Sequence, residues 1–145
     1  MKNNLTKLVR VYMIFGSVYL GLESLIHFSN LRLLDIYSTW PKEVATFSSW
    51  MSIFYASLAA FLSILLLVLQ SDLEKNRATI KLVSLYGIFH GSLLIFASFT
   101  VSFDQIYTLH PSLGFWLPSY NSFIFVEAVL LYVFAALVYL WQKRN

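Results

Sequence analysis

The chain alternates between long apolar stretches and short segments that carry most of its charges. Four stretches of about 20 residues are apolar almost throughout: Val9–Phe28, Phe47–Gln70, Ile80–Phe103 and Ser122–Trp141. A helix of about 20 residues crosses the hydrocarbon core of a bilayer, because it rises about 1.5 Å per residue. Open strands would leave backbone groups unpaired in lipid. The pattern therefore predicts an all-α integral membrane protein, a bundle of four transmembrane helices.

The length of the chain leaves room for this bundle and for little else. Four spans and their connections account for most of the 145 residues, so we predict a single transmembrane domain over residues 1–145. Only 12% of the residues are charged, against about 25% in soluble domains, which agrees with the membrane class. Cysteine is absent, which excludes disulfides, thiolate metal ligands and a cysteine nucleophile.

The basic residues lie unevenly along the chain. Eight of the ten fall at the two chain ends or near the connection 71–79, and the other two, Arg32 and Lys42, fall in the connection 29–46. Cytoplasmic loops carry the excess of Lys and Arg, so both termini are predicted to be cytoplasmic, in the inner membrane of a bacterium or archaeon. The net charge of +3 comes from residues that flank the spans and form no patch, so no nucleic acid partner is expected.

Four ionisable residues stand inside the predicted spans: Glu23, His27, His90 and Glu127. Such groups are costly in a bilayer and usually mark a functional site. Counting helical rise places both glutamates roughly 7 Å below the outward boundary, with His27 at that boundary and His90 near the middle. The sequence thus predicts an outward-facing polar site within the bundle.

The first span presents one polar stripe, in which Tyr12, Gly16, Tyr19, Glu23 and His27 recur every three or four residues. That stripe is expected to face protein or trapped water rather than lipid. A carboxylate and an imidazole one turn apart could share a proton, form a hydrogen bond, or bind a divalent metal such as Zn or Fe.

The third span carries His90 between Gly87 and Gly91. Two glycines four residues apart let a neighbouring helix approach closely, which predicts a packing notch. Open space beside the histidine would also suit ligation of a haem from one side. We expect Tyr86, one turn before His90, to support the site.

In the fourth span Glu127 lies on an otherwise apolar stripe. It is expected to be protonated or to pair with His27, His90 or Tyr55. If Glu23 faces it, their repulsion favours a shared proton or a bound cation. Hydroxyls toward the outward half of span two would bond neighbouring helices or line the cavity, whereas Ser63, nearer the cytoplasm, carries no such signal.

The outward connections 29–46 and 104–121 are rich in aromatic residues. One interpretation is an interfacial belt of Trp and Tyr. The alternative is a lid that folds over the cavity, for which the candidates are Trp40, His110 and Trp116.

Three functions fit these observations. The first is binding of a metal ion or of a cationic or amphipathic small molecule through the Glu and His side chains, which could support catalysis. The second is an accessory subunit of a larger membrane complex, and the third is a proton-coupled transporter that acts as a homodimer. The usual catalytic motifs are absent, so the sequence does not decide whether the protein is an enzyme.

Overall fold

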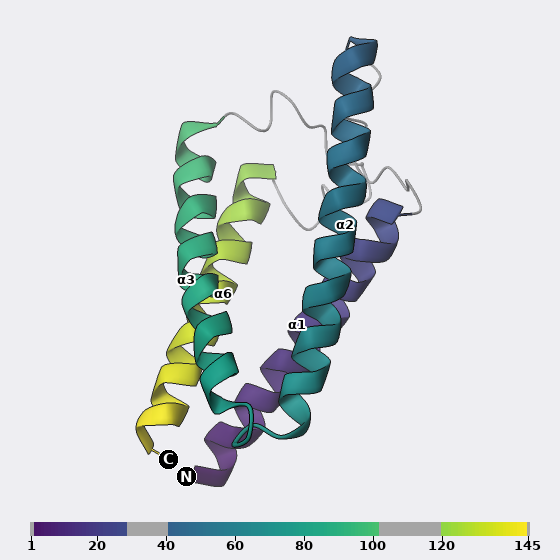
Figure 1. The fold of residues 1–145 in the computed structure, drawn as a ribbon. Coiled ribbons are helices and arrows are strands. Elements are labelled where there is room, and N and C mark those ends of the chain that lie inside the picture. The colour runs from purple at the N-terminus through teal and green to yellow at the C-terminus, as the bar shows by residue number, and fades with distance from the viewer. Residues whose placement is uncertain (1, 29–40, 102–119, 145) are drawn as a thin grey trace.

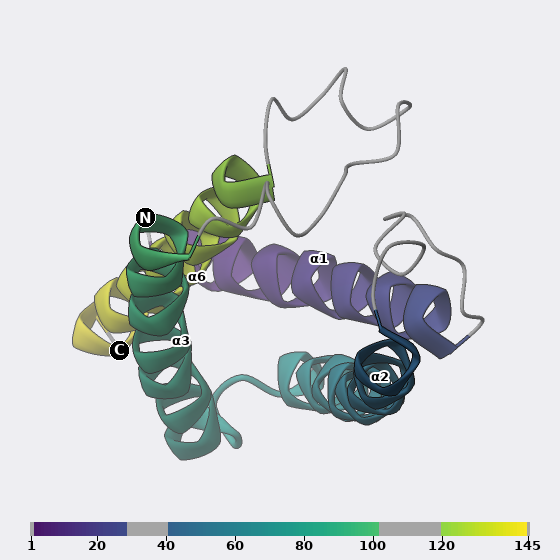
Figure 2. The same cartoon turned by 90° about the horizontal axis from the view of Figure 1, so that it is seen from above.

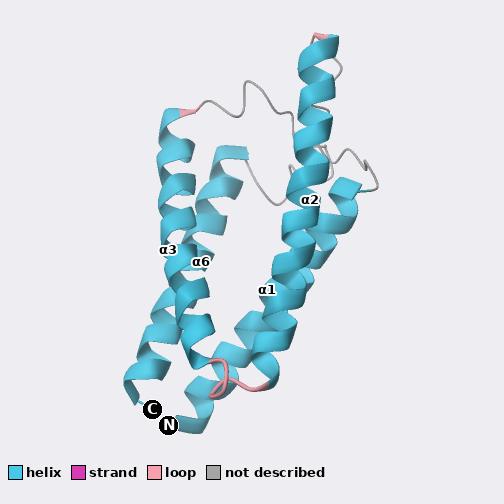
Figure 3. Ribbon diagram, in the orientation of Figure 1, coloured by secondary structure: helices cyan, strands magenta, loops and turns pink. Residues whose placement is uncertain are grey.

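The computed structural model describes residues 2–28, 41–101 and 120–144, and within these it is all-helical. The helices are α1 (Lys2–Phe28), α2 (Lys42–Ser71), α3 (Arg77–Thr100) and α6 (Tyr120–Arg144) (Figure 3). All four are long and apolar enough to cross a membrane. The predicted all-α fold is therefore confirmed for the described part of the chain.

The helices extend into the polar segments that flank the predicted spans. Helix α1 already begins at Lys2 and α6 continues to Arg144, because lysine and arginine are good helix formers and end in charged groups that can reach water. Helix α3 ends earlier than predicted. It stops at Thr100, and Val101 has extended backbone while its N–H still donates to Ala97 O.

The four helices form two antiparallel pairs (Figures 1 and 2). Helix α1 packs along α2, α3 packs along α6, and α1 also touches α6. Helices α2 and α3 are joined by residues 72–76 but make no extended contact. Both termini and this turn lie at the same end of the molecule, which we call the closed end (Figure 1).

Small and hydroxyl residues hold α1 against α2. The Ser17 hydroxyl donates to Ser63 O at 2.8 Å, and the Ser63 hydroxyl donates back to Ser17 O at 2.8 Å. Two turns away on both helices, Ser24 donates to Ala56 O at 2.9 Å. The expectation that Ser63 carries no polar role was wrong, since its short side chain meets Ser17 at the centre of this contact.

Glycine lets α6 approach α3, as the sequence predicted. A Cβ atom at Gly91 would lie 3.3 Å from Ala128 O and 3.3 Å from the Tyr132 ring. One further bond joins the pair, between the Ser92 and Tyr132 hydroxyls at 2.7 Å. The glycine face of α3 is thus filled by α6.

The closed end holds the main hydrophobic core. Its residues come from all four helices and the 72–76 turn: Val9, Met13, Leu66, Leu69, Leu73, Ile80, Phe134, Val138 and Trp141. Trp141 is fully buried, with the Arg77 guanidinium 5.8 Å from its ring. Arg77 also donates to Gln142 O, and the Gln142 amide donates to Arg77 O at 3.2 Å. This core seals the space between the two helix pairs on the side of the termini.

Candidate functional site

A cavity of about 210 Å³ lies between the two helix pairs and is lined by residues from all four helices. Most of its lining is aliphatic or aromatic. Its side chains with polar atoms are Tyr12, Tyr19, Tyr55, Tyr86, His90 and Glu127. No Lys or Arg is among the described residues that line it, so Glu127 has no lysine or arginine beside it in the described cavity wall.

Helix α6 carries Glu127 into the cavity. Phe123 and Leu131, one turn before and one turn after it, line the same space, as the predicted apolar stripe requires. Within residues 2–28, 41–101 and 120–144, the carboxylate takes part in neither a hydrogen bond nor an ion pair. It interacts electrostatically with Glu23 and with Tyr19. The two glutamates, remote in sequence, are therefore brought within range of each other.

Glu23, on α1, is held by two tyrosines. The Tyr55 hydroxyl, from α2, donates to one carboxylate oxygen at 3.0 Å, and the Tyr19 hydroxyl, one turn away on α1, donates to the other at 3.4 Å. Both tyrosines line the cavity, whereas Glu23 is not among its lining residues. Glu23 thus has protein partners for both oxygens, in contrast to Glu127.

His27 is bonded to α2. Its Nδ1 is 2.6 Å from the Ser52 hydroxyl, and its ring meets the Tyr55 ring edge to face at 5.0 Å. The pairing of Glu23 with His27 that the one-turn spacing suggested is replaced by separate bonds from each residue to α2. His27 lies outside the cavity lining and supports Tyr55, which binds Glu23.

His90 lines the cavity from α3 and stacks on Tyr86, with ring centroids 5.8 Å apart and 5° between the ring planes. The space beside the two glycines, which haem ligation would use, is filled by Leu131 and Ala128 of α6. His90 therefore acts as part of an aromatic wall in this structure.

A metal site receives no support from the described residues. Within them, no three His, Asp or Glu side chains come together closely enough to hold an ion. The predicted Zn or Fe ligands are dispersed, because His27 bonds to Ser52 and His90 stacks on Tyr86. The three lid candidates, Trp40, His110 and Trp116, lie outside the described residues.

Two features of the site were missed in the sequence. One is that Tyr19, Tyr55 and Tyr86, from three different helices, line the same cavity, which depends on how the helices are arranged. The other is the contact that brings Tyr55 to Glu23. Small residues recur on α2 at Ser52, Ala56, Ala59 and Ser63, with spacings of four, three and four, and this repeat was a readable signal for the α1–α2 contact.

Comparison with known proteins gives no match: no family model, no curated protein and no solved structure corresponds to this chain.

Proposed function

We propose that this is an integral membrane protein, with its closed end at the cytoplasmic side, that binds a small organic cation in the cavity between its helix pairs. The observation that carries the proposal is Glu127, a carboxylate that lines an apolar and aromatic cavity without a hydrogen bond to any described residue. In such surroundings the local dielectric constant is low, so a carboxyl group either takes up a proton or is stabilised as the anion by a counter-ion. A cationic ligand supplies that counter-ion.

The aromatic wall favours an organic cation over a metal ion. Tyr19, Tyr55 and Tyr86 all line the cavity that Glu127 enters. Aromatic faces attract cations, contributing from about 0.5 kcal/mol when exposed to about 2 kcal/mol when desolvated, and such walls bind quaternary ammonium groups. A divalent metal needs several oxygen or nitrogen ligands at close range, and the described residues provide no such group.

Glu23 contributes to the same site without touching the ligand. Its charge lies within electrostatic range of Glu127, and its two hydrogen bonds fix the hydroxyl ends of Tyr19 and Tyr55. This arrangement orients two rings of the cavity wall and adds negative potential behind them. Glu127 then serves as the direct counter-ion and Glu23 as a positioning residue.

Binding of tetramethylammonium to the purified protein in lipid nanodiscs tests this proposal. We expect Glu127→Gln to weaken the affinity at least tenfold, because the amide keeps the shape of the side chain and removes its charge. Glu43→Gln is the matched control: Glu43 is exposed in the first turn of α2, away from the cavity. An unchanged dissociation constant in Glu127→Gln would refute the assignment.

A further inference from the structure

We infer that the ligand is an amphiphile whose cationic head binds at Glu127 and whose alkyl tail leaves the cavity between α2 and α3 into the bilayer. This inference rests on the proposed function and adds the chemical class of the ligand and its route of entry. It follows from the shape of the cavity and the packing of the helices around it.

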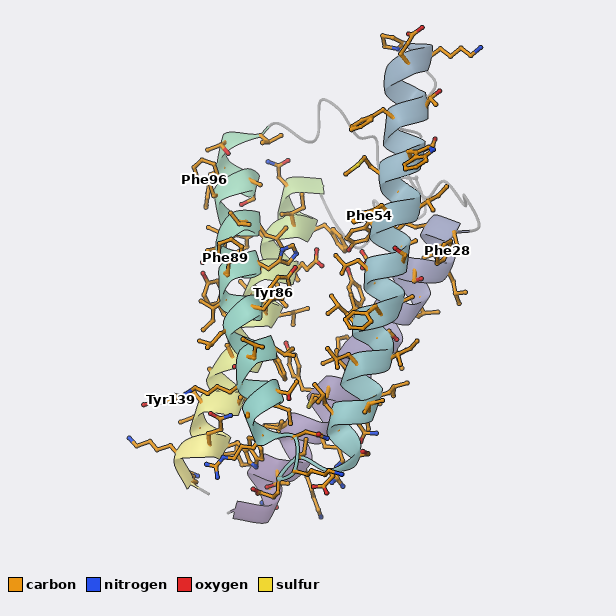
Figure 4. All side chains as sticks on the ribbon, viewed as in Figure 1. Phe28, Phe54, Tyr86, Phe89, Phe96 and Tyr139 are labelled. Carbon is orange, nitrogen blue, oxygen red and sulfur yellow. The ribbon has the colours of Figure 1, made fainter. Side chains whose placement is uncertain are left out.

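The side of the cavity between α2 and α3 is open. Leu58 of α2 and Tyr86 of α3 both line the cavity, yet they remain 42% and 46% exposed. The two helices also make no extended contact along this side, so the cavity meets the surface between them. Figure 4 shows Tyr86 and Phe54 on the facing sides of α3 and α2.

On the opposite side the cavity lining also includes exposed residues, Phe15 of α1 with Val126 and Leu130 of α6, at 57%, 47% and 40% exposed, but a helix contact crosses this side. There α1 and α6 are in contact, and Tyr12 bridges them, with its hydroxyl donating to Leu130 O at 2.6 Å and its ring stacked on Phe134 at 5.7 Å. Toward the closed end, the hydrophobic core with buried Trp141 fills the space between the pairs. Of the two lateral sides, the one between α2 and α3 therefore offers the wider passage.

The rim of this opening suits a hydrocarbon tail. The cavity lining includes Leu58 and Leu62 from α2 and Val83 and Tyr86 from α3, and none of the described residues that line it from these two helices is Asp, Glu, Lys or Arg. A ligand with a tail can keep that tail among the lipid acyl chains while its head reaches Glu127. Such a ligand reaches the site within the membrane, whereas a compact cation dissolved in water must leave its hydration shell to cross the same apolar rim.

The test compares the binding of two quaternary ammonium probes, tetramethylammonium and dodecyltrimethylammonium, to the protein in nanodiscs. The concentration of dodecyltrimethylammonium is expressed as moles per mole of lipid. Leu58→Trp adds a bulky side chain at the opening. We expect it to weaken dodecyltrimethylammonium binding at least fivefold and to change tetramethylammonium binding less than twofold. Leu67→Trp is the control, since Leu67 is 46% exposed on the same helix but does not line the cavity, and neither affinity should change.

A reversible block provides a second measurement that does not depend on the tolerance of Leu58→Trp. The chain has no cysteine, so Leu58→Cys with Tyr86→Cys introduces the only thiols. Joining them with a reducible bifunctional thiol reagent should slow dodecyltrimethylammonium binding at least tenfold, and reduction should restore the rate, which also shows that the protein is folded.

The inference is overturned if Leu58→Trp affects both probes equally or neither, or if the cross-link leaves the entry rate unchanged. In each of these cases the proposed function would still hold if Glu127→Gln weakens tetramethylammonium binding. If Glu127→Gln instead binds tetramethylammonium with unchanged affinity, the proposed function itself is refuted.

Discussion

The two glutamates of the site differ in whether protein groups donate hydrogen bonds to their carboxylate oxygens. Glu23 receives hydrogen bonds from Tyr19 and Tyr55, one for each carboxylate oxygen. Glu127 faces the cavity and meets no donor among the described residues. A hydrogen bond to a charged group contributes about 1.5–3 kcal/mol in soluble proteins, so Glu23 is the more firmly held of the two. The unpaired carboxylate is the one that a cation can reach.

Tyr55→Phe tests the bond from α2 to Glu23. The change removes the hydroxyl that makes the 3.0 Å hydrogen bond and keeps the ring that meets His27. Side-chain hydrogen bonds between transmembrane helices average about 0.6 kcal/mol and reach about 1.7 kcal/mol. We expect Tyr55→Phe to lower the free energy of unfolding by about 1 kcal/mol, measured by steric trapping in bicelles.

Tyr139→Phe is the control for this measurement. Tyr139 is 65% exposed on α6, away from the cavity lining, and its hydroxyl has no hydrogen bond to a described residue. Its loss should change the free energy of unfolding by less than about 0.3 kcal/mol, within the range of ordinary surface substitutions. Equal effects of the two variants would show that the Tyr55 bond contributes nothing specific.

The depth of the ionisable residues along their helices could be predicted from the sequence, but the side chains that they contact could not be predicted. The regular rise of about 1.5 Å per residue placed Glu23 and Glu127 at one level, and the structure brings the two within electrostatic range. The sequence does not state which helix lies beside α1. His27 therefore looked like a partner for Glu23 on its own helix, whereas α2 offers it the Ser52 hydroxyl at 2.6 Å.

Each helix pair is held by a stripe of small residues on its inner face. In α1 and α2 the stripe includes Ser17 and Ser63, and in α3 it includes Gly87 and Gly91. In lipid there is no hydrophobic driving force between apolar helices, so close backbone approach and interhelical hydrogen bonds decide which faces meet. Hydropathy alone was enough to predict the four long apolar helices, because it measures transfer into lipid, but it carries little information on these contacts.

The two glycines of α3 provide a matched pair for testing this packing. A Cβ atom at Gly87 would make ordinary contacts, 3.8 Å from a Leu131 methyl group, whereas one at Gly91 would lie 3.3 Å from the Ala128 backbone oxygen. We expect Gly91→Ala to lower the melting temperature by several degrees, since a helix backbone cannot move aside locally. Gly87→Ala should be neutral or slightly stabilising, because alanine restricts the unfolded chain. Equal melting temperatures for the two variants would argue against a tight crossing at Gly91.

Among the described residues, the main core joins the two pairs at the closed end, and the cavity lies between the pairs beyond it. The closed end combines the core around Trp141 with the bonds between Arg77 and Gln142, so it fixes the pairs where α2 turns into α3. Farther from this core, α2 and α3 make no extended contact and the cavity separates the pairs. The polar groups of the site lie on the far side of the core from the termini. A ligand bound there is separated from the closed end by packed hydrocarbon.

The orientation of this arrangement follows from its charges. The closed end carries eight of the ten Lys and Arg residues, so from the positive-inside rule we expect it in the cytoplasm, with the cavity toward the outward leaflet. Lys75→Cys and Lys42→Cys each introduce a single thiol, the first in the turn at the closed end and the second at the opposite end of α2; both lysines are exposed. Each variant removes one positive charge, and most of the remaining Lys and Arg residues still lie at the closed end.

In spheroplasts, a membrane-impermeant maleimide should label Lys42→Cys at once and Lys75→Cys only after the membrane is permeabilised. Labelling in the reverse order would place the closed end outside, and the cavity would then receive its ligand from the cytoplasmic leaflet. Labelling of both thiols before permeabilisation, in spheroplasts that keep a cytoplasmic marker enclosed, would contradict a fixed membrane-spanning arrangement. Because both variants replace an exposed lysine in the same cysteine-free chain, a difference in labelling reports the side of the membrane on which each thiol lies.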